Sequence, residues 1–377
     1  AAPAAPVEVD AFGAAEVEQI VPSPAPAIHM SMWWNEEVAV RDLELVDGMP
    51  GFRWVKQKFA WRDIEGLAKS SYDWFRTDRI VQQAEQQGLY LLVRIDRPPF
   101  WAQADGGATP LENAPPADLQ DMEDICYAIA ARYKGRIHAY QVWNEPNLAR
   151  EWGEQPPDPA AYVRLLERCY VGIKAGDPDA LVISAGLAPT GTGFPVAMPD
   201  DEYLQAMYDA GGAQFFDMLG LNAPGYAAPP AVTVSNPEYG GFRWNAFRHV
   251  EDMRRIMVAN GDAHKQVAIL EMGWTTDRIN PDYKWFAVSP QEQAEYLAGA
   301  YWYARQHWQP WAGIMTTIYI PDPYWDSSRE EYWWGITFPG WPEPIYRPAY
   351  FALKGLPDWS GRFYDDSEYW QRRAITR

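Results

Sequence analysis

The chain has 377 residues, of which 51 are acidic and 32 are basic, giving a formal net charge of −19. This excess of negative charge would repel phosphate backbones, so nucleic acid is not expected as a partner. No apolar run approaches the roughly 18 residues that a membrane-spanning helix needs, so no such helix is expected. The 20 Trp, 22 Tyr and 14 Phe exceed the usual aromatic content and require a separate explanation.

The first 24 residues are rich in alanine and proline and contain few large apolar side chains. Such a composition is typical of a linker or tail that remains after processing. We therefore expect residues 1–24 to form a linker, which could tether the protein to another module. The same feature is compatible with export, and it favours an extracellular or cell-surface location.

From residue 25 onward, eight short apolar runs alternate with longer segments of helical periodicity. The runs are 27–33, 52–57, 89–95, 137–143, 180–186, 215–222, 266–272 and 313–320. Several of the helical segments open on Asp or Ser and close on Gly, which are helix start and stop signals. Eight strand and helix units predict an α/β fold, a single (β/α)8 or TIM barrel over residues 25–356. The polar and aromatic segment 357–377 is expected to pack on the barrel as a C-terminal extension.

Two glutamates follow the fourth and seventh of these runs. In "IHAYQVWNEP", Pro146 prevents the strand from continuing beyond Glu145. In "QVAILEMGW", regular alternation would place Val267, Ile269 and Glu271 on one face. Because the carboxyl ends of barrel strands meet at one mouth, we expect the two carboxylates to face one cavity. Cleavage of a glycosidic bond requires such a pair, although either glutamate alone could be a capping or surface residue.

The sequence around these glutamates resembles a known group of enzymes. "WNEPN" after a strand, followed three units later by "ILEMGW", is similar to the clan A retaining glycoside hydrolases, especially families near the family 39 β-xylosidases. "FAWRDIE" and "RPAYFALKG" extend the similarity over most of residues 27–355. The resemblance implies that Glu145 is the general acid/base, Glu271 the nucleophile and Asn144 the partner of the sugar 2-hydroxyl. It also implies cleavage of a β-linked oligo- or polysaccharide with retention of configuration.

The chain departs from this family pattern at the end of the second strand and after the sixth. Relatives usually carry an arginine at the end of the second strand, whereas this chain has Lys56, which keeps the charge but lacks the planar fork of donors. After the sixth strand, Asn222 and Pro224 replace the usual His-x-Tyr, so the tyrosine that touches the nucleophile is absent unless Tyr226 replaces it. These departures leave a second hypothesis open, in which the barrel binds carbohydrate or serves as an accessory subunit without efficient catalysis.

Other residues near predicted strand ends are candidates for sugar binding. His29, Arg94 and Asp96 would reach the mouth from the first and third strands, although structural ion pairs explain them equally well. Sugar C–H faces pack on aromatic rings, so tryptophans at strand ends are candidate platforms, with core packing as the alternative. The aromatic candidates are Trp143, Trp274 and Trp325. The segment 331–335 is expected to form a lip over the cleft.

The sequence predicts neither a metal nor a cofactor. The five histidines are scattered, and no His-x-x-x-His, Cys-x-x-Cys or nucleotide-binding glycine motif is present. Cys126 and Cys169 lie in predicted helices of adjacent units. For these two cysteines, a disulfide and a pair of buried free thiols both remain open.

Overall fold

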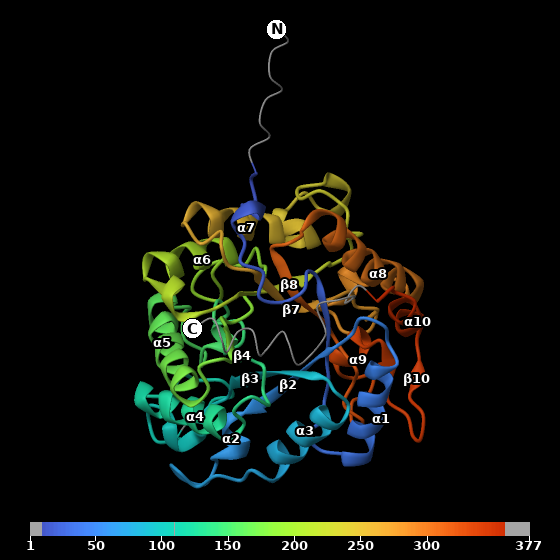
Figure 1. Cartoon of the computed structure of the whole chain (residues 1–377). Coiled ribbons are helices and arrows are strands. Elements are labelled where there is room, and N and C mark those ends of the chain that lie inside the picture. Colours follow the sequence, from blue (N-terminus) through green and yellow to red (C-terminus); the bar gives the residue numbers. More distant parts are fainter. Residues whose placement is uncertain (1–9, 109, 359–377) are drawn as a thin grey trace.

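The computed structural model describes residues 10–108 and 110–358. Its centre is an eight-stranded parallel sheet in the order β5-β4-β3-β2-β1-β8-β7-β6 (Figure 1). Parallel bridges from Ile183 to Met218 and from Leu187 to Leu221 join the two outer strands of this order, which closes the sheet into a barrel. The strands are β1 (Ala25–His29), β2 (Trp54–Ala60), β3 (Tyr90–Asp96), β4 (Ala139–Val142), β5 (Leu181–Ile183), β6 (Leu219–Pro224), β7 (Val267–Gly273) and β8 (Ala312–Thr317). Each overlaps one of the eight predicted runs, so the predicted (β/α)8 barrel is confirmed.

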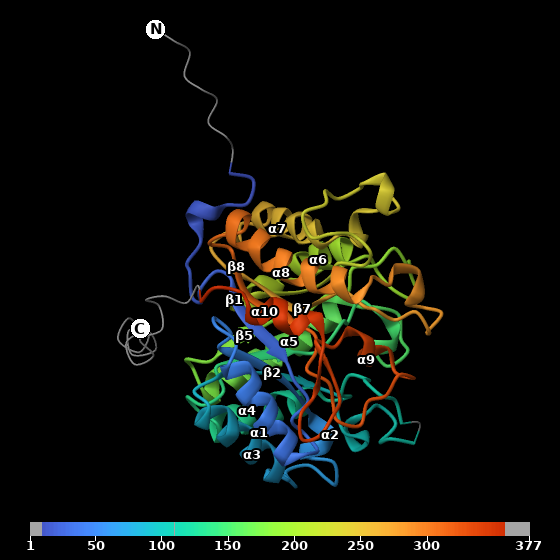
Figure 2. The same cartoon turned by 90° about the vertical axis from the view of Figure 1, so that its right-hand side faces the viewer.

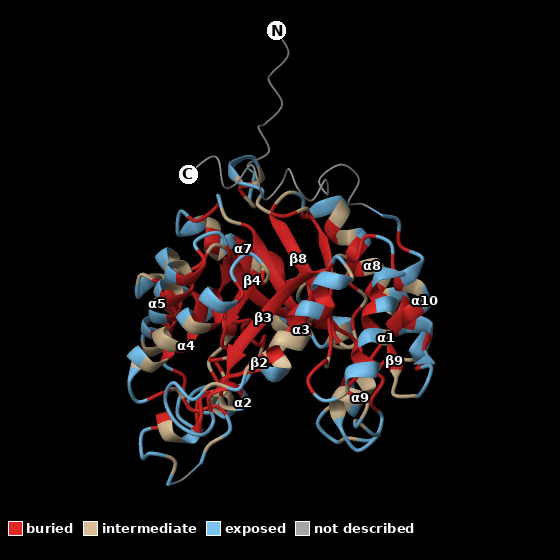
Figure 3. Ribbon diagram, turned by 60° about the horizontal axis from the view of Figure 1, so that its bottom comes forward, coloured by how far each residue is buried: buried red, intermediate tan, exposed pale blue. Residues whose placement is uncertain are grey.

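Helices surround the barrel, and their apolar faces lie against it (Figures 1 and 3). Side-chain caps set several starts: Asp118 caps α4, Asp158 caps α5, and Ser289 forms a reciprocal capping box with Glu292 at the start of α8. The helices are α1 (Glu36–Asp47), α2 (Trp61–Ile64), α3 (Phe75–Gln86), α4 (Leu119–Arg132), α5 (Pro159–Gly176), α6 (Asp200–Asp209), α7 (Val250–Ala259), α8 (Pro290–His307), α9 (Glu330–Trp334) and α10 (Pro348–Lys354). A short hairpin of β9 (Thr337–Phe338) and β10 (Ile345–Tyr346) follows α9.

The apolar core has two main layers. Side chains such as Trp54, Leu92 and Leu270 fill the barrel interior, and a larger cluster, including Val55 and Ile269, lies between the barrel and the helices. Adjacent residues of one strand therefore belong to different layers, as the two-residue period of a strand requires. Figure 3 shows the resulting pattern of buried strands enclosed by helices with exposed outer faces.

The described part of the N-terminal segment packs against the barrel. Backbone N–H groups of Ile20 and Val21 both donate to Oε1 of Gln266 at 2.9 Å, and Val21 is buried in the interior cluster. Residues 10–24 therefore are not a free linker, because their backbone and apolar groups are bound at the N-terminal face. Residues 1–9 of the predicted linker and 359–377 of the predicted C-terminal extension lie outside the described residues.

The longest connections lie at the carboxyl ends of the strands. They include residues 143–158, 184–199, 225–249 and 274–289, whereas 87–89 and 177–180 suffice at the opposite end. These long loops form the barrel mouth, and Figure 2 shows α9 in this region, on the side of the barrel away from the N-terminal segment.

Among the helices of residues 10–108 and 110–358, none combines the length and the hydrophobicity that a membrane span requires.

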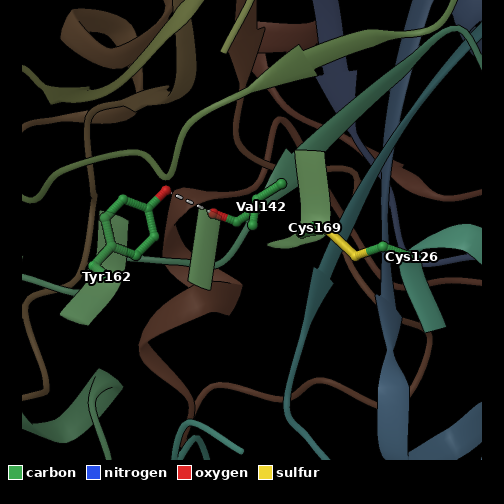
Figure 4. Close-up of a disulfide and its surroundings, with 4 residues drawn as sticks. All are labelled: Cys126, Val142, Tyr162 and Cys169. Atoms are coloured by element: carbon green, nitrogen blue, oxygen red, sulfur yellow. Dashed lines mark hydrogen bonds between the residues drawn. A yellow bond between two sulfur atoms is a disulfide. The ribbon is translucent and has the colours of Figure 1, made fainter. Parts of the chain in front are cut away.

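A disulfide joins two neighbouring helices. Cys126 of α4 and Cys169 of α5 are both fully buried, and their sulfur atoms are bonded at 1.98 Å (Figure 4). This finding decides between the two alternatives that the sequence left open. Close by, the hydroxyl of Tyr162 donates to the carbonyl of Val142 at 3.0 Å and accepts from the N–H of Ala185 at 2.6 Å. Helix α5 is thus tied to the ends of β4 and β5, directly before Glu145.

Candidate active site

A hollow with a volume of about 770 Å³ opens at the mouth of the barrel. Loops after β4, β5, β6, β7 and β8 line it. We call this hollow the main cleft. Glu145 and Glu271 both line it, with side chains that are 16% and 15% exposed. The two predicted carboxylates therefore share one cavity and both remain accessible to a ligand.

The backbone after β4 reverses direction sharply to present Glu145. Trp143 and Glu145 have positive φ angles of 75° and 40°, which residues other than glycine rarely adopt. Asn147 holds this turn, because its Nδ2 donates to the carbonyls of Ala188 (2.8 Å) and Met198 (3.0 Å) while its Oδ1 accepts from the N–H of Ala188. The second asparagine of "NEPN" therefore anchors the turn to the loop after β5, a role that the sequence did not reveal.

Glu271 reaches the cleft through an irregularity in β7. Leu219 pairs with Val267 and Leu221 with Ile269, but the next residue of β6, Asn222, pairs with Glu271. Leu270 is therefore an extra residue, and this shift re-aims the side chains beyond it. The expectation that Val267 and Ile269 share a face with Glu271 was wrong, because those two residues pack outward against the helices. The bulge brings Glu271 to the mouth.

The two carboxylates have different electrostatic surroundings. Burial and, after it, the nearby charge of Glu271 raise the pKa of Glu145 to about 7, against the opposing effects of Arg150 and of the amide of Asn222. Asn222 donates from Nδ2 to Oε1 of Glu145 at 2.9 Å, and Arg150 lies 3.5 Å from Oε2. Because this pKa lies near neutral pH, Glu145 can hold a proton there and can also release it to a neighbouring group.

Two cations hold Glu271. Arg94 Nη1 lies 3.1 Å and Lys56 Nζ 3.5 Å from Oε1 of Glu271, and Lys56 also donates to the carbonyl of Leu270 at 2.9 Å. Lys56 is fully buried, which lowers its pKa to about 8, although Glu271 opposes this shift. The guanidinium that the family pattern places at the end of the second strand is supplied here by Arg94 from the third.

Arg94 also organises its other neighbours. Its Nη1 donates to Oδ1 of Asn144 at 2.9 Å, and its Nε lies 2.9 Å from Oδ2 of Asp96. Burial acts to lower the pKa of Arg94, but Asp96 and Glu271 more than offset it and raise the pKa. Arg94 and Asp96 thus form a buried ion pair that orients Asn144 and Glu271. Of the two alternatives that the sequence left open for Arg94 and Asp96, this is the structural ion pair.

Two of the predicted aromatic platforms are in the core. Trp143 is fully buried against Trp152, and its Nε1 donates to the carbonyl of Glu151 at 2.8 Å. Trp274 is fully buried as well, and its Nε1 donates to the carbonyl of Ala228. Neither ring has a free face for a sugar. For Trp143, the positive φ breaks the strand alternation and turns the ring outward from the barrel.

Other aromatic rings line the main cleft, and most of them come from the long loops after β6 and β7. Tyr226 stacks with Trp285 at 5.9 Å and meets Trp244 edge-on at 5.1 Å. The hydroxyl of Tyr226 donates a hydrogen bond to the carbonyl of Pro189. Within the described residues it makes no hydrogen bond to Glu271, so Tyr226 does not take the place of the family tyrosine that touches the nucleophile. Loop residues of this kind lack periodicity, and the sequence offered only their abundance as a signal.

Helix α9 adds a further carboxyl group, that of Glu330, to the main cleft. Glu330 accepts a hydrogen bond from Nε1 of Trp334 at 2.7 Å, and both residues line the cleft. Burial, with smaller contributions from the charges of Glu331 and Glu271, raises the pKa of Glu330 to about 8. The segment 331–335, which the sequence predicted as a lip, thus contributes Trp334 to the wall of the cleft. The sequence analysis did not identify Glu330 as a cleft residue.

A second, smaller hollow of about 370 Å³ lies beside the main cleft. We call it the side pocket. It is lined by His29, Lys58, Arg94, Arg97 and Trp325 among others, and Tyr319 lines both hollows. The side chain of Trp325 meets Tyr319 edge-on at 5.2 Å. Of the predicted binding residues, His29, Arg94 and Trp325 therefore gather here, while Asn222 and Tyr226 line the main cleft. No group of three or more metal-ligating side chains occurs among the residues that the structure describes.

Solved structures of several glycoside hydrolases share this fold. A family 39 glycoside hydrolase from the gut symbiont Bacteroides cellulosilyticus WH2 is 19% identical, with a TM-score of 0.64 over 91% of this chain and 65% of that one. A glucosidase from Croceicoccus marinus is 13% identical, with a TM-score of 0.60 over 90% of this chain and 68% of that one. A GH10 endoxylanase from a sugarcane soil metagenome is 14% identical, with a TM-score of 0.55 over 88% and 97% of the two chains.

These similarities establish the barrel fold, which agrees with the resemblance to clan A seen in the sequence. The chain spans less than two thirds of the length of the family 39 structure. No protein-family model matches the sequence, and no curated protein matches it.

Proposed function

We propose that this protein is a glycoside hydrolase that cleaves a β-linked glycoside by a retaining, two-step mechanism. The observation that carries the proposal is the meeting of Glu145 and Glu271 in one cleft, with the pKa of Glu145 raised to about 7 and Glu271 held by two cations. One group is suited to hold a transferable proton, and the other is stabilised as an anion. That division is what glycosidic bond cleavage requires.

In the first step, Glu145 transfers its proton to the glycosidic oxygen while a carboxylate oxygen of Glu271 bonds to the anomeric carbon. The glycosidic C–O bond breaks, and its electron pair leaves with the departing alcohol. In the second step, ionised Glu145 takes a proton from water, the water oxygen bonds to the anomeric carbon, and the bond to Glu271 breaks. Two inversions give net retention.

Asn144 is positioned to assist this chemistry. Its Oδ1 is occupied by Arg94, while its Nδ2 makes no hydrogen bond within the described residues. The amide can therefore donate to a sugar hydroxyl beside Glu271. We assign the 2-hydroxyl to this contact, as the family resemblance implies, because hydrogen bonds to that group strengthen in the transition state.

The disulfide supports an extracellular location as part of this proposal. Structural disulfides persist mainly in oxidising compartments, and Cys126 and Cys169 form one across α4 and α5. Secretion would also bring the enzyme to an oligo- or polysaccharide outside the cell. Fractionation of the native producer, with detection by antibody, would test this location.

The decisive experiment is hydrolysis of a panel of aryl β-glycosides by the parent protein and by the Glu271→Gln variant. The parent should release the aryl group, and NMR should show the β-anomer as the first sugar product. Glu271→Gln should lose at least about a thousandfold in kcat while remaining folded by circular dichroism. The matched control is Glu202→Gln, which removes an exposed carboxylate on α6. Parent-like turnover by Glu271→Gln, or an α-anomer as first product, would contradict the mechanism.

A further inference from the structure

The side pocket contains a lysine that no other group neutralises. Strand alternation places Lys56 and Lys58 on the same inward face of β2, but only Lys56 has a counter-charge in contact, at Glu271. Lys58 is half-buried and makes no side-chain hydrogen bond or ion pair within residues 10–108 and 110–358. Long cationic side chains are rarely buried without a partner, so this ammonium is available to a ligand.

The charges around Lys58 do not supply the missing partner. Burial lowers the pKa of Lys58, the positive charges of Arg97 and Arg94 also lower it, and the negative charges of Asp96 and Asp63 act to raise it. Asp96 is already paired with Arg94, and Asp63 is exposed and beyond ion-pair distance. An anion entering the pocket would meet a cation that is poorly solvated and uncompensated.

His29 provides a second unsatisfied group in the same pocket. His29 is 8% exposed, and its Nδ1 is buried without a hydrogen-bond partner in the described structure. The pKa of His29 lies well below its usual value because of burial and of the positive charges of Lys56, Arg94 and Lys58. The ring is therefore neutral at pH 7, and its free nitrogen can accept a hydrogen bond from a sugar hydroxyl or donate one to it, depending on the tautomer.

The two hollows differ in the sign of their free charges. The acidic side chains that line the main cleft are Glu145, Glu154, Glu271, Asp282 and Glu330, and its single lining cation is Arg150. The raised pKa values of Glu145 and Glu330 let these two hold protons near neutral pH, but the other three carboxyl groups still outnumber the one cation, so the cleft disfavours an anionic ligand. The side pocket also has acidic members, but Asp322 accepts from Ser31 and from the N–H of Tyr324. Asp63 and Glu331 also line the side pocket, against the four cations Lys58, Arg94, Arg97 and Arg329.

The position of the general acid decides which part of a substrate enters which hollow. Glu145 protonates the leaving group, so that group extends into the main cleft. Arg94, which contacts Glu271, lines the side pocket, and Tyr319 lines both hollows, so the side pocket is the neighbouring space for the sugar that bonds to Glu271. On the basis of the proposed function, we infer that the side pocket receives this sugar and that Lys58 binds a carboxylate on it. The substrate class is then a β-linked glycoside of a uronic acid.

The test compares aryl substrates that differ only at carbon 6. The 4-nitrophenyl β-D-glucuronide and β-D-galacturonide carry a carboxylate there, the glucoside and galactoside carry a hydroxymethyl group, and the xyloside carries nothing. The parent should favour one uronide over its neutral partner by about 10- to 100-fold in kcat/KM, the range for a hydrogen bond to a charged group. A parent that favours the neutral sugar in both pairs overturns the inference.

Variants at Lys58 assign any preference to this residue. Lys58→Met keeps the length of the side chain and removes the charge, so the ratio of uronide to neutral glycoside should fall by about tenfold or more, whereas Lys58→Arg should retain part of the ratio. Lys134→Met, an exposed lysine after α4, is the control for net charge. An unchanged ratio in Lys58→Met, or an equal fall in Lys134→Met, overturns the assignment.

A binding measurement separates this inference from the proposed function. Quenching of tryptophan fluorescence by free D-glucuronate, D-galacturonate, D-glucose and D-galactose needs no catalysis. If no aryl glycoside is cleaved but a uronate binds more tightly than its neutral partner, and Lys58→Met removes the difference, the hydrolase proposal fails and the pocket assignment holds. Equal binding of charged and neutral sugars overturns the pocket assignment even if hydrolysis occurs.

Discussion

Asn222 donates a hydrogen bond from its Nδ2 to Oε1 of Glu145 at 2.9 Å. The residue that departs from the family pattern after the sixth strand thus contacts one of the two carboxylates directly. The same β6 position pairs with Glu271 across the bulge in β7. Asn222 therefore couples the positions of both carboxyl groups, and its replacement of histidine does not by itself favour a non-catalytic barrel.

This contact predicts a change in the pH profile. The amide of Asn222 lowers the pKa of Glu145, which stands at about 7, so Asn222→Ala should raise it. The acid form of Glu145 is needed for the first step, and activity falls as pH rises through this pKa. The alkaline limb of kcat/KM should therefore lie near pH 7 in the parent and move to higher pH in Asn222→Ala.

Arg150→Met provides an independent check on the same group. Removing the positive charge of Arg150, 3.5 Å from Glu145, should shift the limb in the same direction. Limbs that stay in place or move to lower pH in both variants would show that Glu145 does not control this titration.

Removal of the Glu145 carboxyl should depend on the leaving group. Glu145→Ala should reduce turnover of glycosides with poor leaving groups by about 10²- to 10⁴-fold, since no acid then protonates the departing oxygen. Dinitrophenyl glycosides need little protonation and should lose much less in their first step. Added azide should restore turnover and yield the β-glycosyl azide, which NMR identifies. An equal loss for all leaving groups, without azide rescue, would indicate a structural role.

Arg94 should be important for stability as well as for activity. Arg94→Met leaves the carboxylate of Asp96, which is 1% exposed, without its cation. Breaking a buried ion pair in this way should lower the free energy of unfolding by about 3–5 kcal/mol, measured by urea denaturation. The control is Arg168→Met, which removes an exposed pair with Glu123 and should cost about 1 kcal/mol or less.

The companion variant Arg94→Met/Asp96→Asn tests the cause of that loss. It removes the uncompensated charge, so it should recover part of the stability of the single variant. A double variant that is less stable than Arg94→Met would show that packing, and not the buried charge, dominates at this position.

The disulfide should contribute to stability through the unfolded state. Cys126 and Cys169 are 43 residues apart, and closure of a loop of this size predicts a contribution of about 2–4 kcal/mol. Cys126→Ala/Cys169→Ala should therefore unfold at lower urea concentration than the parent. Reduction of the parent in denaturant should lower its midpoint similarly. Equal midpoints for the parent and the double variant would place the stabilising contribution elsewhere.

Local sequence patterns predicted the fold well because each barrel unit is built from local signals. Apolar runs, helix caps at Asp118, Asp158 and Ser289, and the block to strand extension at Pro146 lie within a few residues of the structures that they specify. The motif around Glu145 and the strand before Glu271 placed both carboxylates at one mouth for the same reason: all barrel strands end there.

The sequence by itself therefore determined the barrel, the order of its units and the strand ends that carry the two glutamates. Only the tertiary structure decided how the site is completed. The bulge at Leu270 depends on the register of β6, the outward turn of Trp143 depends on a positive φ held by a neighbouring loop, and the cation that replaces the family arginine comes from a different strand. Each of these features joins residues that are distant in the chain, so no local pattern of alternation or spacing records it.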